Sequence, residues 1–312
     1  TNQRSTDTLS WAQIIGGDGG YTGVRPAHAG YVYGEYQGTG NLYRSTNYGS
    51  GMSYIGSSIS SGDRNCFLPP YAISPVNDAE MLYGTHRVWY SADSGTTWVA
   101  RSGDLTGGAG AIRCLVVAPS QPQTAYAVTT DGRVQVSTNF GSTWALSLTG
   151  VPGWPRTTRQ IAVDPANDQR AVLAVSNFGV DQVRLTTNRG GSWTAIDGDL
   201  PDIPVNTAAI ESRPCQDVIY IGSDAGVYVT VNGGVNWKRL ASNFPNAPVI
   251  DLILDAARNR LIAGTQGRGA WQIALSPHGD FDGGGLGFSD IPPFVDALLN
   301  PTAPGNCIGD MN

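Results

Sequence analysis

The sequence predicts an all-β protein, a β-propeller of four-stranded blades, with about six blades in this chain or with the chain forming part of a larger propeller. Three observations lead to this fold class: a composition poor in helix formers, an internal repeat of nearly constant spacing, and four short strand-like segments within each repeat. The segments are separated by turns rich in Gly, Asn and Asp. Four short strands between such turns are typical of one antiparallel blade.

The composition argues against several other classes. The 312 residues include three glutamates and one lysine, too few strong helix formers for a helical protein. No apolar run approaches the roughly 18 residues of a membrane helix, so we expect no membrane span. The net charge of −6 and the absence of Lys/Arg clusters argue against a nucleic-acid partner. The low lysine content and the charged fraction of 14% fit a secreted or cell-surface protein.

A turn motif of the form [ST]-x-[DN]-x-G-x-x-W recurs along the chain. Its copies span 91–98, 137–144, 186–193 and 230–237, and a degenerate copy at 45–52 ends in Met52 in place of tryptophan. We interpret each copy as the hairpin between the third and fourth strands of a blade. The Asp or Asn accepts backbone N–H groups, the glycine takes a positive φ, the Ser/Thr hydroxyl caps the turn, and the tryptophan packs between blades.

These copies resemble Asp-box (bacterial neuraminidase, BNR) repeats, and residues 1 to about 275 are similar to the Asp-box β-propellers. That group includes sialidases, xyloglucan-active glycoside hydrolases and the sortilin-type receptor domain. The segment 263–271 is similar to the last strands of secreted bacterial members. The resemblance therefore implies a propeller domain over 1–275. In propellers the functional residues usually lie on loops around the central channel.

The two ends of the repeat region indicate how the ring closes. Residues 250–275 form an expected sixth blade with three strands and no turn motif, and 9–14 resembles a strand leaving the motif, with Trp11 in the tryptophan position. We therefore expect 9–14 to pair with the outer edge of the 250–275 blade, which would remove both free sheet edges. The alternative is that Thr1 lies within a longer propeller.

The segment 276–312 departs from the repeat and resembles an incomplete dockerin-type module, a pair of EF-hand-like calcium loops. Gly284 occupies a position where an acid or Asn normally ligates, so a glycine-rich surface turn is the competing interpretation. We expect this tail to continue past Asn312 and to offer a site for assembly. The resemblance places a Ca²⁺ site on Asp280, Asp282, Gly284, Leu286 and Asp290.

The four cysteines show no C-x-x-C spacing, which argues against zinc and against a redox motif. In an oxidising compartment four cysteines should pair. Cys66 precedes the first strand of the second blade and Cys114 begins the first strand of the third, so we expect a Cys66–Cys114 bridge. Cys215–Cys307 would then tie the tail to the fifth blade.

Few residues qualify as functional candidates. Asp18 lies in a glycine-rich stretch just before a first strand, where a residue of the channel mouth would be, and Glu35 follows on the next strand. A glycosidase needs two carboxylates, and the sequence identifies no partner for Asp18. Arg25 occupies a common strand-end position, and no sialidase arginine triad can be assigned. Trp154 has no role in the repeat and is a candidate aromatic platform. The ligand-binding candidates are Trp154 and Asp18, with no catalytic residue.

These observations favour a non-catalytic extracellular binding or assembly module. The expected partner is a polysaccharide or an extracellular protein, and Ca²⁺ in the tail is the only expected cofactor. Two alternatives stay open: a glycoside hydrolase of the sialidase or xyloglucanase type, acting on polysaccharide, and a structural subunit of an extracellular assembly. Propellers host many functions, so the fold does not decide among these alternatives.

Overall fold

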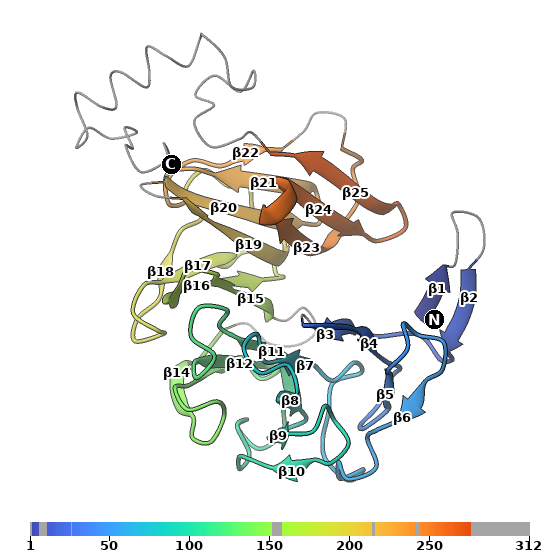
Figure 1. Cartoon of the computed structure of the whole chain (residues 1–312). Coiled ribbons are helices and arrows are strands. Elements are labelled where there is room, and N and C mark those ends of the chain that lie inside the picture. The colour runs from blue at the N-terminus through green and yellow to red at the C-terminus, as the bar shows by residue number, and fades with distance from the viewer. Residues whose placement is uncertain are drawn as a thin grey trace.

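The computed structural model describes residues 2–5, 11–25, 27–151, 158–213, 216–240 and 244–275. These ranges contain five four-stranded antiparallel sheets, one three-stranded antiparallel sheet and one two-stranded hairpin. The one helical element among them is a short 3₁₀ turn, η1 (Ala256–Arg258). Figure 1 shows the six larger sheets arranged as blades around a common centre. The predicted all-β propeller is confirmed.

Each blade takes its strands in chain order. The first blade contains β3 (Thr22–Arg25), β4 (His28–Glu35), β5 (Leu42–Ser45) and β6 (Ser53–Tyr54). The second contains β7 (Tyr71–Ile73), β8 (Met81–Gly84), β9 (Val88–Ser91) and β10 (Val99–Ala100). The third contains β11 (Ile112–Val117), β12 (Ala125–Thr129), β13 (Val134–Ser137) and β14 (Ala145–Leu148).

The later blades follow the same order. The fourth contains β15 (Thr158–Asp164), β16 (Asn167–Val175), β17 (Val183–Thr186) and β18 (Thr194–Ala195). The fifth contains β19 (Val205–Arg213), β20 (Gln216–Ser223), β21 (Gly226–Thr230) and β22 (Lys238–Arg239). The sixth contains β23 (Val249–Asp255), β24 (Arg260–Thr265) and β25 (Gly269–Ala274).

The repeated motif forms the same turn between the third and fourth strands of five blades. The first-position hydroxyl accepts the N–H of the motif glycine at 2.8–3.0 Å and donates to the Asp or Asn. The residue before the glycine also takes a positive φ, for example 61° at Ser94 and 51° at Phe140. The predicted roles of the hydroxyl, the Asp/Asn and the glycine are therefore confirmed, and the motif residues are architectural.

The motif tryptophans are less uniform than predicted. Trp98 and Trp237 are buried, whereas Trp144 and Trp193 are only half-buried. We expected Trp98, Trp144, Trp193 and Trp237 to occupy equivalent buried positions between blades, and this is wrong because the residue that receives the indole on the preceding blade differs. Trp98 meets Ile55, whereas Trp193 donates its indole N–H to the Ser147 hydroxyl at 2.9 Å.

Apolar clusters join consecutive blades. Five clusters occupy the junctions from the first and second blades through the fifth and sixth, with buried residues such as Tyr33, Leu115, Val128, Ile219 and Leu252. Within the described residues no such cluster joins the sixth blade to the first. Figure 1 shows the corresponding gap between β25 and the N-terminal strands.

The predicted ring closure by 9–14 is wrong for this structure. The strand β2 (Trp11–Ile15) pairs with β1 (Asn2–Ser5), and not with β25. A hairpin between segments close in sequence costs less loop-closure entropy than pairing across the ring, which favours the local partner. The sixth blade therefore has three strands within the part of the chain that is described.

The predicted Cys66–Cys114 disulfide is also wrong, because both cysteines are free. Cys114 packs against the apolar cluster between the third and fourth blades, next to residues such as Ile161. Cys66 belongs to a segment held against the first blade, since the Phe67 carbonyl accepts the N–H of Gly38 at 3.0 Å. The two thiols thus lie on segments that are held by different blades. Cys215 and Cys307 fall outside the described residues.

Candidate functional site

The centre of the ring is hollow. A cavity of about 610 Å³ lies at the channel, and the inner strands β7, β11, β15, β19 and β23 succeed one another around it. Its wall combines these strands with the Gly-rich segment before β3. Polar and charged residues of the wall are Asp18, Arg113, Gln160, Asn206 and Asp251. The cavity is therefore open to polar ligands.

Four inner strands carry a register irregularity at the same place. The pairing shifts between Ile112 and Cys114 in β11, and at the matching positions at the start of β15, β19 and β23. A β-bulge re-aims side chains and is common next to functional sites. In this chain the shifts coincide with wall residues of the cavity, among them Arg113, Asn206 and Ile250.

Asp18 lies in the wall of this cavity, as the sequence predicted for a channel-mouth residue. Its backbone N–H donates to the Gln37 side-chain oxygen at 3.1 Å, and Gly17 and Gly19 on either side have φ values of 75° and 74°. Gly20 has a different role, since a Cβ there would lie 2.6 Å from Cγ of Glu35. The glycines therefore serve both a tight turn and a close backbone approach.

Glu35 lies beneath the channel wall and is 1% exposed. One carboxyl oxygen accepts the backbone N–H of Tyr21 at 3.1 Å. Burial raises the pKa of Glu35 to about 8, although the Tyr21 hydrogen bond acts in the opposite direction. At neutral pH this side chain is mostly an uncharged carboxylic acid, so it supports the segment 16–21 without adding a charge to the cavity.

The cavity wall presents charges of both signs. Surrounding protein desolvates Asp251 and raises its pKa, although the side chain still meets solvent in the cavity. Arg113 is half-buried, and within the described ranges its guanidinium forms no ion pair or side-chain hydrogen bond. A cation held in a concave wall without an internal partner is suited to bind a carboxylate.

Two neutral wall residues are fixed by hydrogen bonds. The Gln160 side-chain oxygen accepts the N–H of Ala208 at 3.0 Å and the hydroxyl of Thr207, which ties the fourth blade to the fifth. The Asn206 side chain accepts from Ser176 at 2.8 Å and donates to Asp224 at 3.0 Å. These side chains are positioned by the fold before any ligand arrives.

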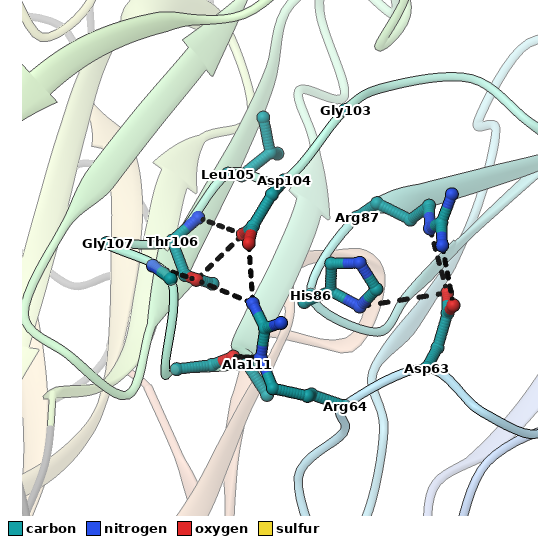
Figure 2. A network of polar contacts seen from close by, with 12 residues as sticks. Asp63, Arg64, His86, Arg87, Gly103, Asp104, Leu105, Thr106, Gly107 and Ala111 are labelled. Carbon is teal, nitrogen blue, oxygen red and sulfur yellow. Dashed lines mark hydrogen bonds and ion pairs between the residues drawn. The ribbon is translucent and has the colours of Figure 1, made fainter.

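A polar network holds the long connection between the first and second blades. Figure 2 shows the Asp63 carboxylate facing Arg87, whose two hydrogen bonds to it measure 2.8 and 3.0 Å, and His86 beside them. Burial acts against the Asp63 carboxylate, yet the bonds from Arg87, Thr85 and Trp89 outweigh it and lower its pKa. Leu68 and Pro70 of the same connection line the cavity, so the network positions part of its wall.

Arg25, the candidate strand-end residue, is structural. Its guanidinium forms an ion pair with Asp78, donates to the Ser94 hydroxyl at 2.9 Å and lies 4.4 Å from the ring of Tyr31. These bonds join the first blade to the second and lower the pKa of Asp78 to about 2. The sequence prediction that Arg25 belongs to the repeat and not to a sialidase site agrees with this placement.

Two other predicted sites cannot be placed. Trp154 and the calcium candidates Asp280, Asp282, Gly284, Leu286 and Asp290 lie outside the described residues. Among the residues that are described, no group of three or more His, Cys, Asp or Glu side chains could hold a metal ion. No helix in these ranges is long and apolar enough to cross a membrane.

Sequence reasoning missed Arg113, Asn206 and Asp251. An alignment of the inner strands would have found them, because each occurs near the start of such a strand, before the apolar residues that pack between blades. A repeat comparison limited to the turn motif concentrates on what the blades share. The side chains that line the cavity, by contrast, differ from blade to blade.

Comparisons with known proteins agree on the fold. No family model and no curated protein matches the chain. Among solved structures, the GH74 xyloglucanase from Xanthomonas campestris matches at 15% identity and a TM-score of 0.61, covering 85% of this chain and 45% of that one. An ancestral GH74 enzyme matches at 19% identity and 0.59, covering 84% and 39%. YCF48 bound to D1 peptide matches at 12% identity and 0.56, covering 81% and 80%.

These similarities define the class of fold, a six-bladed β-propeller. In this chain the central cavity is lined by both polar and apolar residues. The chain spans less than half the length of the two GH74 enzymes and about four fifths of YCF48. At such identities the likeness concerns the fold alone.

Proposed function

We propose that the chain is a non-catalytic, extracellular binding module of the Asp-box type that binds an extended segment of a partner protein at the central cavity. The observation that carries this proposal is Arg113, a half-buried guanidinium in the cavity wall with no internal carboxylate partner among the described residues. An Arg in a desolvated site binds carboxylates through paired hydrogen bonds.

The charge pattern favours a polypeptide over a neutral sugar. Arg113 would accept an acidic side chain, while Asp18 and Asp251 would pair with a basic one. A segment of mixed charge satisfies both groups, whereas a neutral polysaccharide would leave these charges without counter-charges. YCF48, which matches over most of its own length, is bound to a peptide in its solved structure. That similarity supports the proposal without identifying the partner.

The test uses a labelled (Glu-Lys)₄ peptide and a (Gln-Lys)₄ control in fluorescence polarisation. We expect Arg113→Gln to weaken binding of the first peptide by about tenfold or more and not to weaken binding of the control, which has no side-chain carboxylate for Arg113 to bind. Arg268→Gln is the matched variant, because Arg268 is exposed on the turn between β24 and β25. An equal loss of both peptides in Arg113→Gln, or an equal loss in Arg113→Gln and Arg268→Gln, would contradict the proposal.

A second candidate function is glycoside hydrolysis. One observation favours it: Asp18 and Asp251 line the same cavity, and the raised pKa of Asp251 is what a general acid requires. The assay measures release of reducing sugar from xyloglucan by the wild type, Asp18→Asn and Asp251→Asn. Activity lost in both variants would replace the binding proposal with this one.

The tail remains a separate proposal. We propose that 276–312 binds Ca²⁺ through Asp280, Asp282 and Asp290 and serves assembly. Calcium prefers six to eight oxygen ligands, so three carboxylates would need carbonyls and water to complete the shell. Calorimetric titration of the full chain with calcium should give heat that Asp282→Ala removes, and an unchanged isotherm would eliminate the site.

A further inference from the structure

The burial of each motif tryptophan depends on the identity of one residue on the preceding blade. Three residues after each motif tryptophan, or after Met52, the chain places Ile55, Arg101, Ser147, Ile196 and Leu240 on successive blades. Where this residue is Ile, the tryptophan of the next blade is buried and donates to its carbonyl: Trp98 to Ile55 and Trp237 to Ile196, both at 2.9 Å. Where it is Arg101 or Ser147, the next tryptophan is half-buried.

Leu240 on the fifth blade occupies the position that corresponds to Ile55 and Ile196, and it faces the sixth blade. We call this position the receptor for the next tryptophan. The N–H of Leu240 bonds to the Val227 carbonyl at 2.8 Å, as that of Ile55 bonds to Leu42 and that of Ile196 to Val183. Beside it lies a cavity of about 240 Å³, lined by Val227, Leu240, Phe244, Leu261 and Trp271 among others. An apolar cavity of roughly 150 Å³ already holds a benzene molecule. The junction is therefore preformed for an indole that the described sixth blade does not supply.

The strand beside this cavity has a free edge. β25 pairs with β24 on one side, and its other side has no partner among the described strands. Five of its six residues are exposed, including Trp271 at 40%, whereas the third strand of the third blade, β13, is buried throughout. Free edges of this kind pair readily with further strands.

A matching strand exists at the other end of the chain. Trp11, Ala12, Gln13 and Ile14 repeat the pattern of Trp237 through Leu240, a tryptophan followed three residues later by an aliphatic residue. Among the described strands, the strand β2 that contains them pairs with β1 alone, so its second edge has no partner there. A two-stranded hairpin is marginally stable by itself and gains from joining a sheet.

We propose that this hairpin docks on the sixth blade of a second copy of the chain. In that complex β2 pairs with the free edge of β25, and the Trp11 indole enters the cavity beside Leu240 and donates to its carbonyl. Within one copy the hairpin and the sixth blade belong to separate sheets that Figure 1 shows apart. Because donor and receptor are different surfaces, the association is head to tail: it closes into a ring where the rotation between copies allows it and otherwise extends into open oligomers.

The experiment measures the mass of the full chain by light scattering over a concentration series. We expect oligomers that grow with concentration. Trp11→Ala, which removes the donor side chain, and Leu240→Trp, which fills the receptor, should each weaken association by about tenfold or more. Phe178→Ala removes an exposed aromatic from a different blade and is the matched control.

A mixing experiment sharpens the test. Trp11→Ala retains the receptor and Leu240→Trp retains the donor, so an equimolar mixture should form a dimer and nothing larger. Three results would overturn the proposal: a monomer at all concentrations, oligomers that neither variant affects, or a monomer whose melting temperature falls in Trp11→Ala. The last result would mean that the hairpin docks on its own sixth blade.

Discussion

The turns between the third and fourth strands are nearly the same in five blades, whereas the inner strands around the channel present different side chains. In the turns five blades share nearly identical hydrogen bonds, so Ser45, Ser91 and Ser137 are interchangeable in role. In the channel the blades share a backbone irregularity and differ in the residue that it presents, as Arg113 and Asn206 illustrate. The contrast teaches that repetition maintains the architecture, whereas divergence at equivalent positions indicates the site.

The largest expected effect lies at a junction between blades. Trp237→Ala should cost about 3–5 kcal/mol of unfolding free energy, because it leaves a cavity and an unpaired carbonyl at Ile196. Trp193→Ala, at a half-buried copy of the same position, should cost clearly less. Urea unfolding of both variants measures the difference. Equal losses would show that the two junctions are energetically equivalent.

The second largest expected effect is the pH dependence of stability that comes from Glu35, beneath the channel wall. The pKa of Glu35 is raised in the folded chain, so its contribution to stability is complete below the unfolded value near 4.5 and is lost as pH rises towards 8. We expect a loss on the order of 3 kcal/mol between pH 5 and pH 8. Glu35→Gln should flatten this part of the pH profile of the melting temperature. A profile that is unchanged in the variant would contradict the assignment to Glu35.

The turn motif itself should show an intermediate effect. Ser137→Ala removes the hydroxyl that accepts the N–H groups of Asn139 and Gly141. We expect a cost of about 2 kcal/mol, comparable to the loss of a strong helix cap, since the buried Gly141 N–H is left without its acceptor. Ser91→Ala should cost the same within about 0.5 kcal/mol if the turns are interchangeable, and chemical denaturation of both variants checks this.

The smallest expected change in stability is at the channel wall. Arg113→Gln should alter unfolding free energy by no more than about 0.5 kcal/mol, because the described residues give the guanidinium no internal partner to lose. Peptide binding should fall in the same variant, as set out above. A large loss of stability would assign Arg113 to the architecture and remove the basis of the proposed function.

The fold was predictable because the repeat is local chemistry. Spacing, turn residues and the contact between the Ser/Thr hydroxyl and the Asp/Asn of each motif are encoded within about eight residues, so Gly95 and Gly141 could be assigned positive φ values in advance. Asp18 was placed at the channel for a similar reason, its position just before an inner strand. Asp251, which lines the same cavity, was missed because it lies 233 positions away on the last blade.

Other expectations failed where they required distances across the ring. The Cys66–Cys114 bridge assumed that neighbouring strands bring their side chains together, whereas Cys114 turns towards the fourth blade. Closure by the N-terminal strand assumed that an unpaired edge attracts the matching segment of the same chain. In the structure β2 has its local partner β1, so a suitable pattern did not decide the pairing.

The sequence by itself determined the strands, the turns that join them and the order of the blades, because these depend on hydrogen bonds and backbone preferences between residues close in the chain. Tertiary structure alone decided which polar side chains meet in the cavity, which cysteines remain free and which sheet edge stays open. Those outcomes depend on contacts between residues far apart in the chain, which packing between blades brings together. The packing differs from junction to junction, as Ile55 and Ser147 show by receiving the following tryptophan in different ways.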